Sequence, residues 1–364
     1  MTFTAVEQLR FHYHSRISGA LAQSLPVAGF TSNTVPWEIL RAAGFFPLLL
    51  SPPRAATPHA DEYMESVFDG RIRAIFEHLL AGDWPFLHTL FIPRTSEQEH
   101  KLFLYLREVA RQEPARMLPR VSLFNLLHAM SPEGESYGLE RTRELAREYP
   151  SIADSALRQA IVESNSARSA LRSLLALRPE RILGSEALPL IGAYYLMDRA
   201  EYAALATQAA SELAAGPLLL GPRLLLKGSM LDHPHLHRVL ESYGAIVAAE
   251  DDWWGSRAGG ADISLDADPI AAIFDHYYRN EPSPRVFPPA AADAWFLHAL
   301  PSVDGVVFYL PPEDDVLGWD YPRMRDLVNA RGIPHLVIRD DASAGDLPAE
   351  AHQRIEEFIG DLKR

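Results

Sequence analysis

The feature that most constrains the fold is an alternation of short apolar runs with helical patterns, which occurs twice along the 364 residues. The apolar runs span residues 27–31, 46–50, 86–92 and 121–127 in the first half, and 223–226, 245–248, 305–309 and 336–338 in the second. Such runs, separated by helices, predict parallel strands joined by helical crossovers. We therefore expect an α/β protein with two doubly wound, mainly parallel-sheet domains of the Rossmann or flavodoxin type.

Several helices have recognisable starts and stops. Pro36 suits the first turn of a helix over 36–43, and Gly44 suits its end. A second helix is expected as one long element over 62–81. A helix at the C-terminus shows apolar residues at the i, i+3, i+4, i+7 spacing of one helical face. These residues are Ile355, Phe358, Ile359 and Leu362.

The middle of the chain differs in character. Residues 138–215 are dominated by Ala, Leu, Arg and Glu and contain few turn residues, which favours helices. We expect a helical insert or connector there. The predicted organisation is an N-terminal α/β domain over 1–137, a helical segment over 138–215 and a C-terminal α/β domain over 216–364.

Composition excludes several classes of function. The formal net charge of −14 argues against non-specific nucleic-acid binding, which needs Lys and Arg to neutralise phosphates. No stretch approaches the roughly 20 apolar residues of a membrane span, and no apolar signal region follows the N-terminus, so a cytoplasmic location is expected. No glycine-rich dinucleotide or phosphate loop occurs.

The chain contains no cysteine. This excludes disulfides, cysteine nucleophiles, thiolate metal sites and any cluster held on the chain's own thiolates.

Three histidines alternate in LDHPHLH, at His233, His235 and His237. Apolar residues follow at helical spacing, so we interpret the stretch as a helix start with Asp232 as its cap and Pro234 in its first turn. On a helix the three rings cannot converge on one ion. A two-histidine site using His233 and His237 is the alternative.

The strand before these histidines ends in LLLKGS. A strand leading into a helix N-terminus presents backbone N–H groups to an anion, and ligands of open α/β sheets gather at the carboxyl ends of strands. Ser229 is therefore a candidate pocket residue, with a plain turn as the alternative. The adjacent Trp253 and Trp254 would serve as interface anchors or pack in the core.

Several segments, taken together, resemble one family. In order, they read GFTSNTVPWEILRAAGFFPLLL, RAIFEHLLAGDWPFLHTLFIPRT, DSALRQAIVESNSAR, ILGSEALPLIGAYYL, LLLKGSMLDHP, AIVAAEDDWWGSR and RGIPHLVIRDD with RIEEFI, and they cover roughly residues 25–362. The chain resembles the subunits of 2-hydroxyacyl-CoA dehydratases and the related benzoyl-CoA reductases. The resemblance implies two α/β domains in each of two similar subunits, an iron–sulfur cluster held on cysteines and an ATP-dependent activator that delivers an electron. It also implies an acyl-CoA thioester substrate that passes through a ketyl radical.

This chain departs from the family at the cysteines. Ser32 stands before the proline–glutamate motif, Asp69 stands four residues before the matching Arg73, and IPRTS places Ser96 at a third thiolate position. The last cysteine region falls at Tyr309 or Leu310. A serine hydroxyl is a poor substitute for a soft thiolate. The resemblance therefore implies a member that has lost the cluster, so that this chain holds no metal and no cofactor.

The first hypothesis is a cluster-free subunit that pairs with a homologous cysteine-bearing subunit and helps to form an acyl-CoA site. The partner would carry the iron–sulfur cluster. The catalytic candidates are Glu38, Asp69 and Ser96, and the substrate-binding candidates are Ser32, Asn33, Arg73, Ser229, Ser256 and Arg257. Arg257 could bind a CoA phosphate or a substrate carboxylate with two parallel hydrogen bonds.

Structural readings compete with these assignments. Arg257 could instead form a salt bridge with Asp251 or Asp252, and Glu38 and Arg73 could form an ion pair between helices.

Two other functions stay open. A stand-alone, non-redox enzyme would use Asp69, Glu38 and a histidine such as His78 or His88 for acid–base catalysis in the emptied pocket. A scaffold or regulatory protein of the same fold would stabilise a catalytic homologue.

Overall fold

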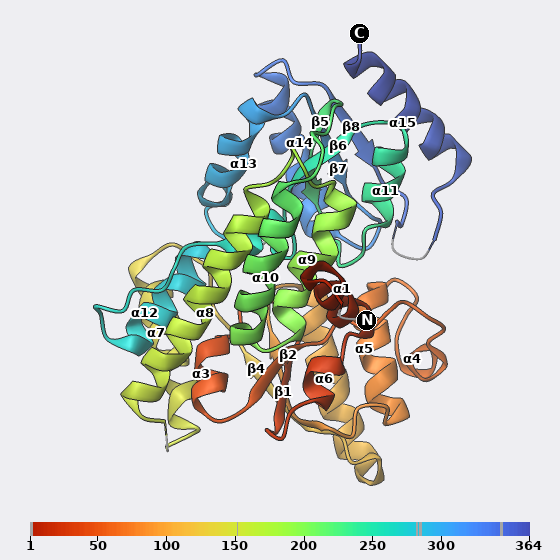
Figure 1. Cartoon of the computed structure of the whole chain (residues 1–364). Helices are drawn as coiled ribbons and strands as arrows, with labels where there is room; N and C mark the ends of the chain where they lie inside the picture. The colour runs from red at the N-terminus through yellow and green to blue at the C-terminus, as the bar shows by residue number, and fades with distance from the viewer. Residues whose placement is uncertain (1–2, 151, 282, 284–285, 343–344) are drawn as a thin grey trace.

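The computed structural model describes residues 3–150, 152–281, 283, 286–342 and 345–364. Within them, eight strands form two parallel four-stranded sheets, of order β2-β1-β3-β4 and β6-β5-β7-β8 (Figure 1). The strands are β1 Val27–Phe30, β2 Phe46–Leu49, β3 Leu87–Pro93, β4 Arg120–Phe124, β5 Arg223–Gly228, β6 Ile246–Asp251, β7 Gly305–Tyr309 and β8 His335–Ile338. Every predicted run is a strand, and the α/β fold class is confirmed.

Helices surround both sheets. They are α1 Ala5–Ser15, α2 Ser18–Leu21, α3 Trp37–Ala42, α4 Pro58–Tyr63, α5 Gly70–Ala81, α6 Glu97–Gln112, α7 Pro132–Arg147, α8 Asp154–Leu175, α9 Gly184–Leu196, α10 Arg199–Ala214, α11 His235–Ser242, α12 Pro269–Asp275, α13 Asp293–Ala299, α14 Asp315–Asn329 and α15 Ala349–Leu362. The predicted apolar face of α15 is confirmed, because Ile355 and Ile359 are buried while Phe358 and Leu362 pack against the same core. Among the described residues, no helix combines the length and apolarity needed to cross a bilayer.

The prediction of one helix over 62–81 is wrong, because the chain turns between α4 and α5. Asp69 begins the second helix: its carboxylate accepts hydrogen bonds from the backbone N–H groups of Arg71 at 2.7 Å and Ile72 at 3.0 Å. A capping aspartate satisfies N–H groups that a continuous helix would use internally. The break places Asp69 at a helix N-terminus instead of in a helix interior.

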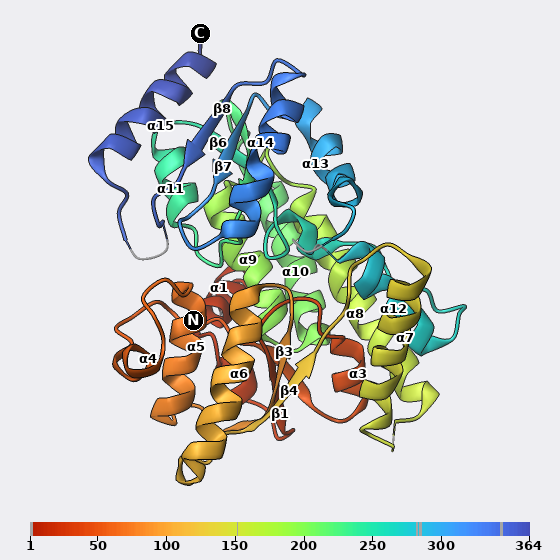
Figure 2. The same ribbon diagram turned by 180° about the vertical axis from the view of Figure 1, so that it is seen from behind.

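The helical segment lies in the middle of the molecule. Helices α8, α9 and α10 stand between the N-terminal sheet, in the lower half of the view, and the C-terminal sheet above it (Figures 1 and 2). Helix α1, from the start of the chain, packs against α9 and α10, and α8 packs against α10. The predicted domain boundaries after residues 137 and 215 stay predictions.

The carboxyl ends of the two sheets meet. All strands within a sheet are parallel, so the segments that follow them collect at one edge. The Gln98 side chain, after β3, donates to the backbone carbonyl of Glu313, after β7, at 3.1 Å. Arg54, after β2, forms an ion pair with Asp232, after β5, at 2.7 Å. Two sets of segments meet here: residues 31–34, 51–54 and 94–99 from the first sheet, and residues 229–233, 252–257 and 310–314 from the second. We call this contact region the seam.

One glycine fixes the chain path at the seam. Gly228 ends β5 with φ +155°, and a Cβ atom there would stand 1.9 Å from the backbone oxygen of Tyr309 on β7. Only glycine fits this close approach of two strands. The next residue, Ser229, donates its backbone N–H to the same Tyr309 oxygen at 3.0 Å. The LLLKGS strand end is therefore held against β7 where it enters the seam.

Candidate functional site at the seam

Ser32, Asp69 and Ser96, the three positions that the sequence resemblance aligns with family cysteines, hold oxygen groups already used in hydrogen bonds. The Ser32 hydroxyl lies 2.8 Å from the Thr95 hydroxyl. The Asp69 carboxylate caps α5, and the Ser96 hydroxyl caps α6 by accepting from the backbone N–H of Glu99 at 3.1 Å. These groups therefore hold together the strand ends and helix starts of the first domain.

The fourth position also lacks ligand character. Tyr309 ends β7, and burial raises the pKa of its phenol, which accepts a hydrogen bond from the backbone N–H of Ala342 at 3.2 Å. Leu310 is buried and apolar. In the part of the chain that the structure describes, no group of three or more His, Cys, Asp or Glu side chains is arranged to hold a metal ion.

Iron–sulfur clusters are bound by soft thiolates. Two hydroxyls and one carboxylate, all engaged locally, do not fit such a cluster.

A buried carboxylate that sequence reasoning missed lies beside these positions. Glu99 accepts a hydrogen bond from the Thr31 hydroxyl at 2.7 Å and another from Thr95. Burial raises the pKa of Glu99, and the Arg71 guanidinium 4.0 Å away counteracts only part of that effect. Arg71 in turn lies over the ring of Trp253, with 6.0 Å between the guanidinium carbon and the ring centre.

A sequence signal for this group exists. Ser96-Glu97-Gln98-Glu99 has the S-x-x-E spacing of a helix capping box, which marks Ser96 as a cap and Glu99 as a residue of the first turn.

Glu38 lies in a different, fully buried network. Its carboxylate accepts hydrogen bonds from Arg168 at 2.6 Å and from the Tyr277 phenol at 2.9 Å. Burial alone would raise its pKa, but the positive charge of Arg168 and the neighbouring His276 outweigh burial and lower the pKa to about 2. Glu38 is therefore a buried, ionised carboxylate in the interior of the first domain.

Arg73 does not pair with Glu38, so the predicted ion pair between them is wrong. Arg73 instead bonds Asp61 and the backbone carbonyls of Met64 and Glu65, at 3.2 and 2.9 Å for the two carbonyls. It closes the turn between α4 and α5. The Asn33 side chain, after β1, donates to Glu281 at 2.6 Å.

The candidates of the second half are also engaged within the chain. Ser229 donates to Asp314 at 2.6 Å, and Ser256 donates to Glu250 at 2.8 Å. Arg257 forms an ion pair with Asp251 at 2.9 Å, which confirms the salt-bridge reading of that residue. The packing reading of the tryptophan pair is also confirmed, because Trp253 and Trp254 are both buried.

The histidine stretch begins a helix, as predicted, but not with the predicted cap. Helix α11 starts at His235, and the Asp232 carboxylate turns away from it to bond Arg54 and Ser51. The charge of Arg54 explains the choice, because an ion pair is stronger than a cap to a neutral N–H. The His237 ring bonds Glu250 at 2.9 Å. The ring centres of His233 and His235 lie 4.7 Å apart. Among the described residues, the three histidines belong to no group of three or more side chains that could hold a metal ion.

The residues proposed for acid–base catalysis are not brought together. His78 bonds Asp83 at 2.7 Å near the end of α5, nine residues after Asp69, which is about 13 Å along a helix at 1.5 Å per residue. His88 lies exposed at the start of β3, away from the carboxyl edge. Within the described residues, these histidines therefore do not join Asp69 in an acid–base group at the seam.

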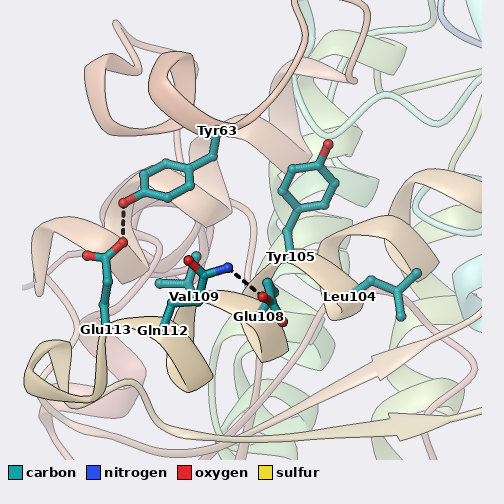
Figure 3. Close-up of a pocket in the computed structure, with 7 residues that line it drawn as sticks. All are labelled: Tyr63, Leu104, Tyr105, Glu108, Val109, Gln112 and Glu113. Atoms are coloured by element: carbon teal, nitrogen blue, oxygen red, sulfur yellow. Dashed lines mark hydrogen bonds between the residues drawn. The ribbon is translucent and has the colours of Figure 1, made fainter.

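A separate pocket of about 350 Å³ lies on α6 and the turn after it (Figure 3). Its walls include the rings of Tyr63 and Tyr105. Its carboxylates are engaged, because Glu113 accepts from Tyr63 and Glu108 accepts from Gln112. The pocket involves the second half of α6, whereas Glu99 and the seam lie at the first turn, so we do not assign it to the seam.

Comparison with known proteins agrees with the sequence resemblance. Residues 33–362 match the family model described as 2-hydroxyglutaryl-CoA dehydratase, D-component. The chain is also 22% identical over 362 residues to the (R)-2-hydroxyglutaryl-CoA dehydratase subunit beta of Acidaminococcus fermentans, covering 94% of this chain and 93% of that protein.

Proposed function

The chain belongs to the 2-hydroxyglutaryl-CoA dehydratase D-component family, and on that premise we propose that it is a cluster-free subunit of a 2-hydroxyacyl-CoA dehydratase-type complex. The observation that carries the proposal is the state of Ser32, Asp69 and Ser96. The resemblance places each of them at a family thiolate position, and each is bound to a neighbouring hydroxyl or backbone N–H. These hydrogen bonds support a fold that needs no cluster at the three positions.

The proposed partner is a homologous subunit that keeps its cysteines and carries the iron–sulfur cluster. In this arrangement the present chain contributes a folded wall to an acyl-CoA site and no redox group. Thr31, Arg71 and Glu99 stand one, two and three residues along the chain from Ser32, Asp69 and Ser96, and they contact one another. Their role is to fix the shape of the strand ends that face the seam. We further propose that the complex is cytoplasmic. We also propose that its substrate is an acyl-CoA thioester of the kind used by 2-hydroxyacyl-CoA dehydratases or by benzoyl-CoA reductase-like enzymes.

A role as a scaffold for the partner is a second candidate, favoured by one observation. Ser229 bonds Asp314 and Arg257 pairs with Asp251, and the other seam candidates, Ser32, Asn33, Ser96 and Ser256, also have partners within the chain. Side chains committed in this way stabilise a surface more readily than they bind a substrate. The two candidates differ in whether the seam touches the thioester.

Co-expression with a cysteine-bearing homologous subunit tests the proposal. We expect anaerobic purification to yield a stable heteromer whose iron and acid-labile sulfide belong to the partner. Loss of dehydration upon removal of the present chain, with the partner's cluster retained, would support the wall role. A protein that stays alone and catalyses a reaction without iron would contradict both candidates.

A further inference from the structure

The pocket between α4 and α6, which we call the α6 pocket, has the size and the walls of a small-molecule site (Figure 3). Its volume of about 350 Å³ falls in the range of about 300–1,000 Å³ that is usual for ligand sites. The rings of Tyr63 and Tyr105 line it, together with Leu104 and Val109. Buried Phe76 contacts both tyrosine rings edge to face, with ring centres 5.8 and 6.3 Å apart. A core residue therefore fixes the two aromatic walls.

The walls of the α6 pocket are poor in donors for an anion. The Tyr63 phenol donates its hydrogen to Glu113 at 2.5 Å, and the Tyr105 phenol donates to Glu65 at 3.3 Å. Neither phenol hydrogen is therefore left for a ligand. The lining residues include no Lys, Arg or His. An anionic ligand, such as a phosphate group, would meet no positive side chain in these walls.

A cationic ligand, in contrast, would meet two carboxylates, because Glu108 and Glu113 both line the pocket. Hydrogen bonds from Arg111 and Gln112 lower the pKa of Glu108 to about 2. A hydrogen bond from a phenol lowers the pKa of Glu113, so both groups are ionised at neutral pH. The α6 pocket therefore has two negative groups beside two aromatic rings.

The arginines that pair with these carboxylates stand outside the lining of the pocket. Arg111 bonds Glu108 at 2.6 Å and Arg116 bonds Glu113 at 2.6 Å, but neither arginine lines the pocket. The side chains of the Arg111–Glu108 pair are both more than half exposed, and such surface pairs are weak. An ionised carboxylate offers about four acceptor positions. Glu113 uses two of them, on Tyr63 and Arg116, so it can accept from a ligand as well.

We propose that the α6 pocket binds a small organic cation with an aromatic body, of the arylalkylamine class. The aromatic body packs against Tyr63 and Tyr105, and the ammonium group donates to Glu113 within the field of Glu108. The cavity is more than twice the roughly 150 Å³ that accommodates benzene, so it has room for one ring and a short charged arm. The site lies at the second half of α6, and it does not depend on the function proposed for the seam.

A series of three ligands of nearly equal size, tested on the unaltered protein at low salt, isolates the charge requirement. Calorimetric titration should show binding of 2-phenylethylamine, at least tenfold weaker binding of 2-phenylethanol, and no binding of phenylacetate. Equal affinity for the amine and the alcohol would overturn the proposal, as would absence of amine binding or tighter binding of phenylacetate.

A coenzyme arm separates the α6 pocket from an acyl-CoA site. Coenzyme A carries several phosphate charges, so we expect it not to compete with 2-phenylethylamine. Competition by coenzyme A would reassign the pocket to the coenzyme and overturn the cation site.

Two glutamate variants on the same helix locate the charge. Glu108→Gln should weaken binding of 2-phenylethylamine at least fivefold, because it removes a negative charge and leaves Arg111 unpaired beside the pocket. Glu97→Gln is the matched control, since Glu97 is also paired with an arginine and its side chain is 52% exposed, against 51% for Glu108. Glu97 stands eleven residues away, about 16 Å along the helix and beyond a Debye length of about 10 Å, so its removal should change affinity less than twofold. Equal effects of the two variants would contradict the assignment.

Two variants of one tyrosine test the aromatic wall. Tyr105→Phe keeps the ring and should retain affinity within about twofold, whereas Tyr105→Leu removes the ring and should weaken amine binding about fivefold. Circular dichroism of each variant checks that the fold is retained. Unchanged affinity in a folded Tyr105→Leu protein would contradict a role for the aromatic wall and overturn the proposed site.

Discussion

The two domains each bury one carboxylate that is held by an arginine of the helical segment, but they hold it differently. In the first domain, Glu38 has one hydrogen bond from Arg168 and one from Tyr277. In the second domain, Glu250 accepts two hydrogen bonds from Arg178, at 2.9 and 2.7 Å.

Glu250 also receives His237 and Ser256, so all of its acceptor capacity is used. The buried carboxylate of the second domain is therefore held from more sides than that of the first.

The shared element is instructive. Arg168 lies on α8, and Arg178 follows shortly after the end of that helix at Leu175. One stretch of the helical segment therefore supplies the counter-charge for both domains. Because an unpaired buried charge is costly, each domain depends on the segment for stability. A simple linker would not supply charges that both domains need for stability. We therefore interpret the helical segment as a structural element that holds the two sheets together.

Removal of either arginine should have the largest effect. Arg178→Met and Arg168→Met each leave a buried carboxylate without its counter-charge, and we expect a loss of about 3–5 kcal/mol in the free energy of unfolding. Urea denaturation followed by circular dichroism measures it. A loss below about 1 kcal/mol for both variants would break the comparison, since it would mean that neither carboxylate depends on the segment.

The matched control removes both charges of one pair. Arg178→Met with Glu250→Met leaves no unpaired ion, so the double variant should be more stable than Arg178→Met alone. If the double variant is the less stable protein, the cost does not come from an isolated charge.

Lowering the pH should reveal the contribution of the Glu38 carboxylate to the stability of the fold. The pKa of Glu38 is lowered to about 2 in the folded protein, so its ion pair stabilises the fold above the ordinary glutamate pKa and loses that effect as the pH falls from about 4.5 to about 2. Glu38→Gln should therefore flatten the stability profile in this window, by up to about 3 kcal/mol. Unfolding titrations from pH 5 to pH 2 measure the slope. Identical slopes for both proteins would show that Glu38 titrates normally.

A third acid distinguishes the second domain. Burial raises the pKa of Asp252 to about 8, with further increases from the charges of Glu250 and Asp251. The folded state therefore favours protonated Asp252, and stability is lost as the pH rises from about 4 to about 8. Asp252→Asn should remove this loss and stabilise the protein at pH 8 by at least about 1.4 kcal/mol relative to its effect at pH 4. Thermal unfolding at the two pH values decides it; a constant difference would contradict the raised pKa.

The smallest expected effect concerns the caps after the third strand of each sheet. Ser96 caps α6 after β3, and Asp314 caps α14 after β7 by accepting from the backbone N–H of Leu317 at 3.1 Å. Ser96→Ala should cost about 1 kcal/mol. Asp314→Ala should cost more, because it also loses the hydrogen bond from Ser229. If urea denaturation shows a larger cost for Ser96→Ala than for Asp314→Ala, the added contribution of the Ser229 bond is contradicted.

Sequence patterns predicted the sheets well because apolar runs between helices leave few alternatives. They missed the break before α5, since Asp69 caps a helix inside an otherwise continuous helical pattern. They also missed the Glu38–Arg168 pair, because 130 residues separate the partners and no local pattern joins them. The spacing from Ser96 to Glu99 predicts a helix cap at Ser96. The family resemblance instead favoured a role for Ser96 at a former thiolate position, so the cap was not predicted.

The most direct test of the account is the iron and acid-labile sulfide content of the isolated chain after anaerobic reconstitution and desalting. We predict that the unaltered chain retains neither, while a variant with Ser32→Cys, Asp69→Cys and Ser96→Cys retains both and gains visible absorbance. Iron and sulfide retained by the unaltered chain would contradict the claim that this family member has given up its cluster.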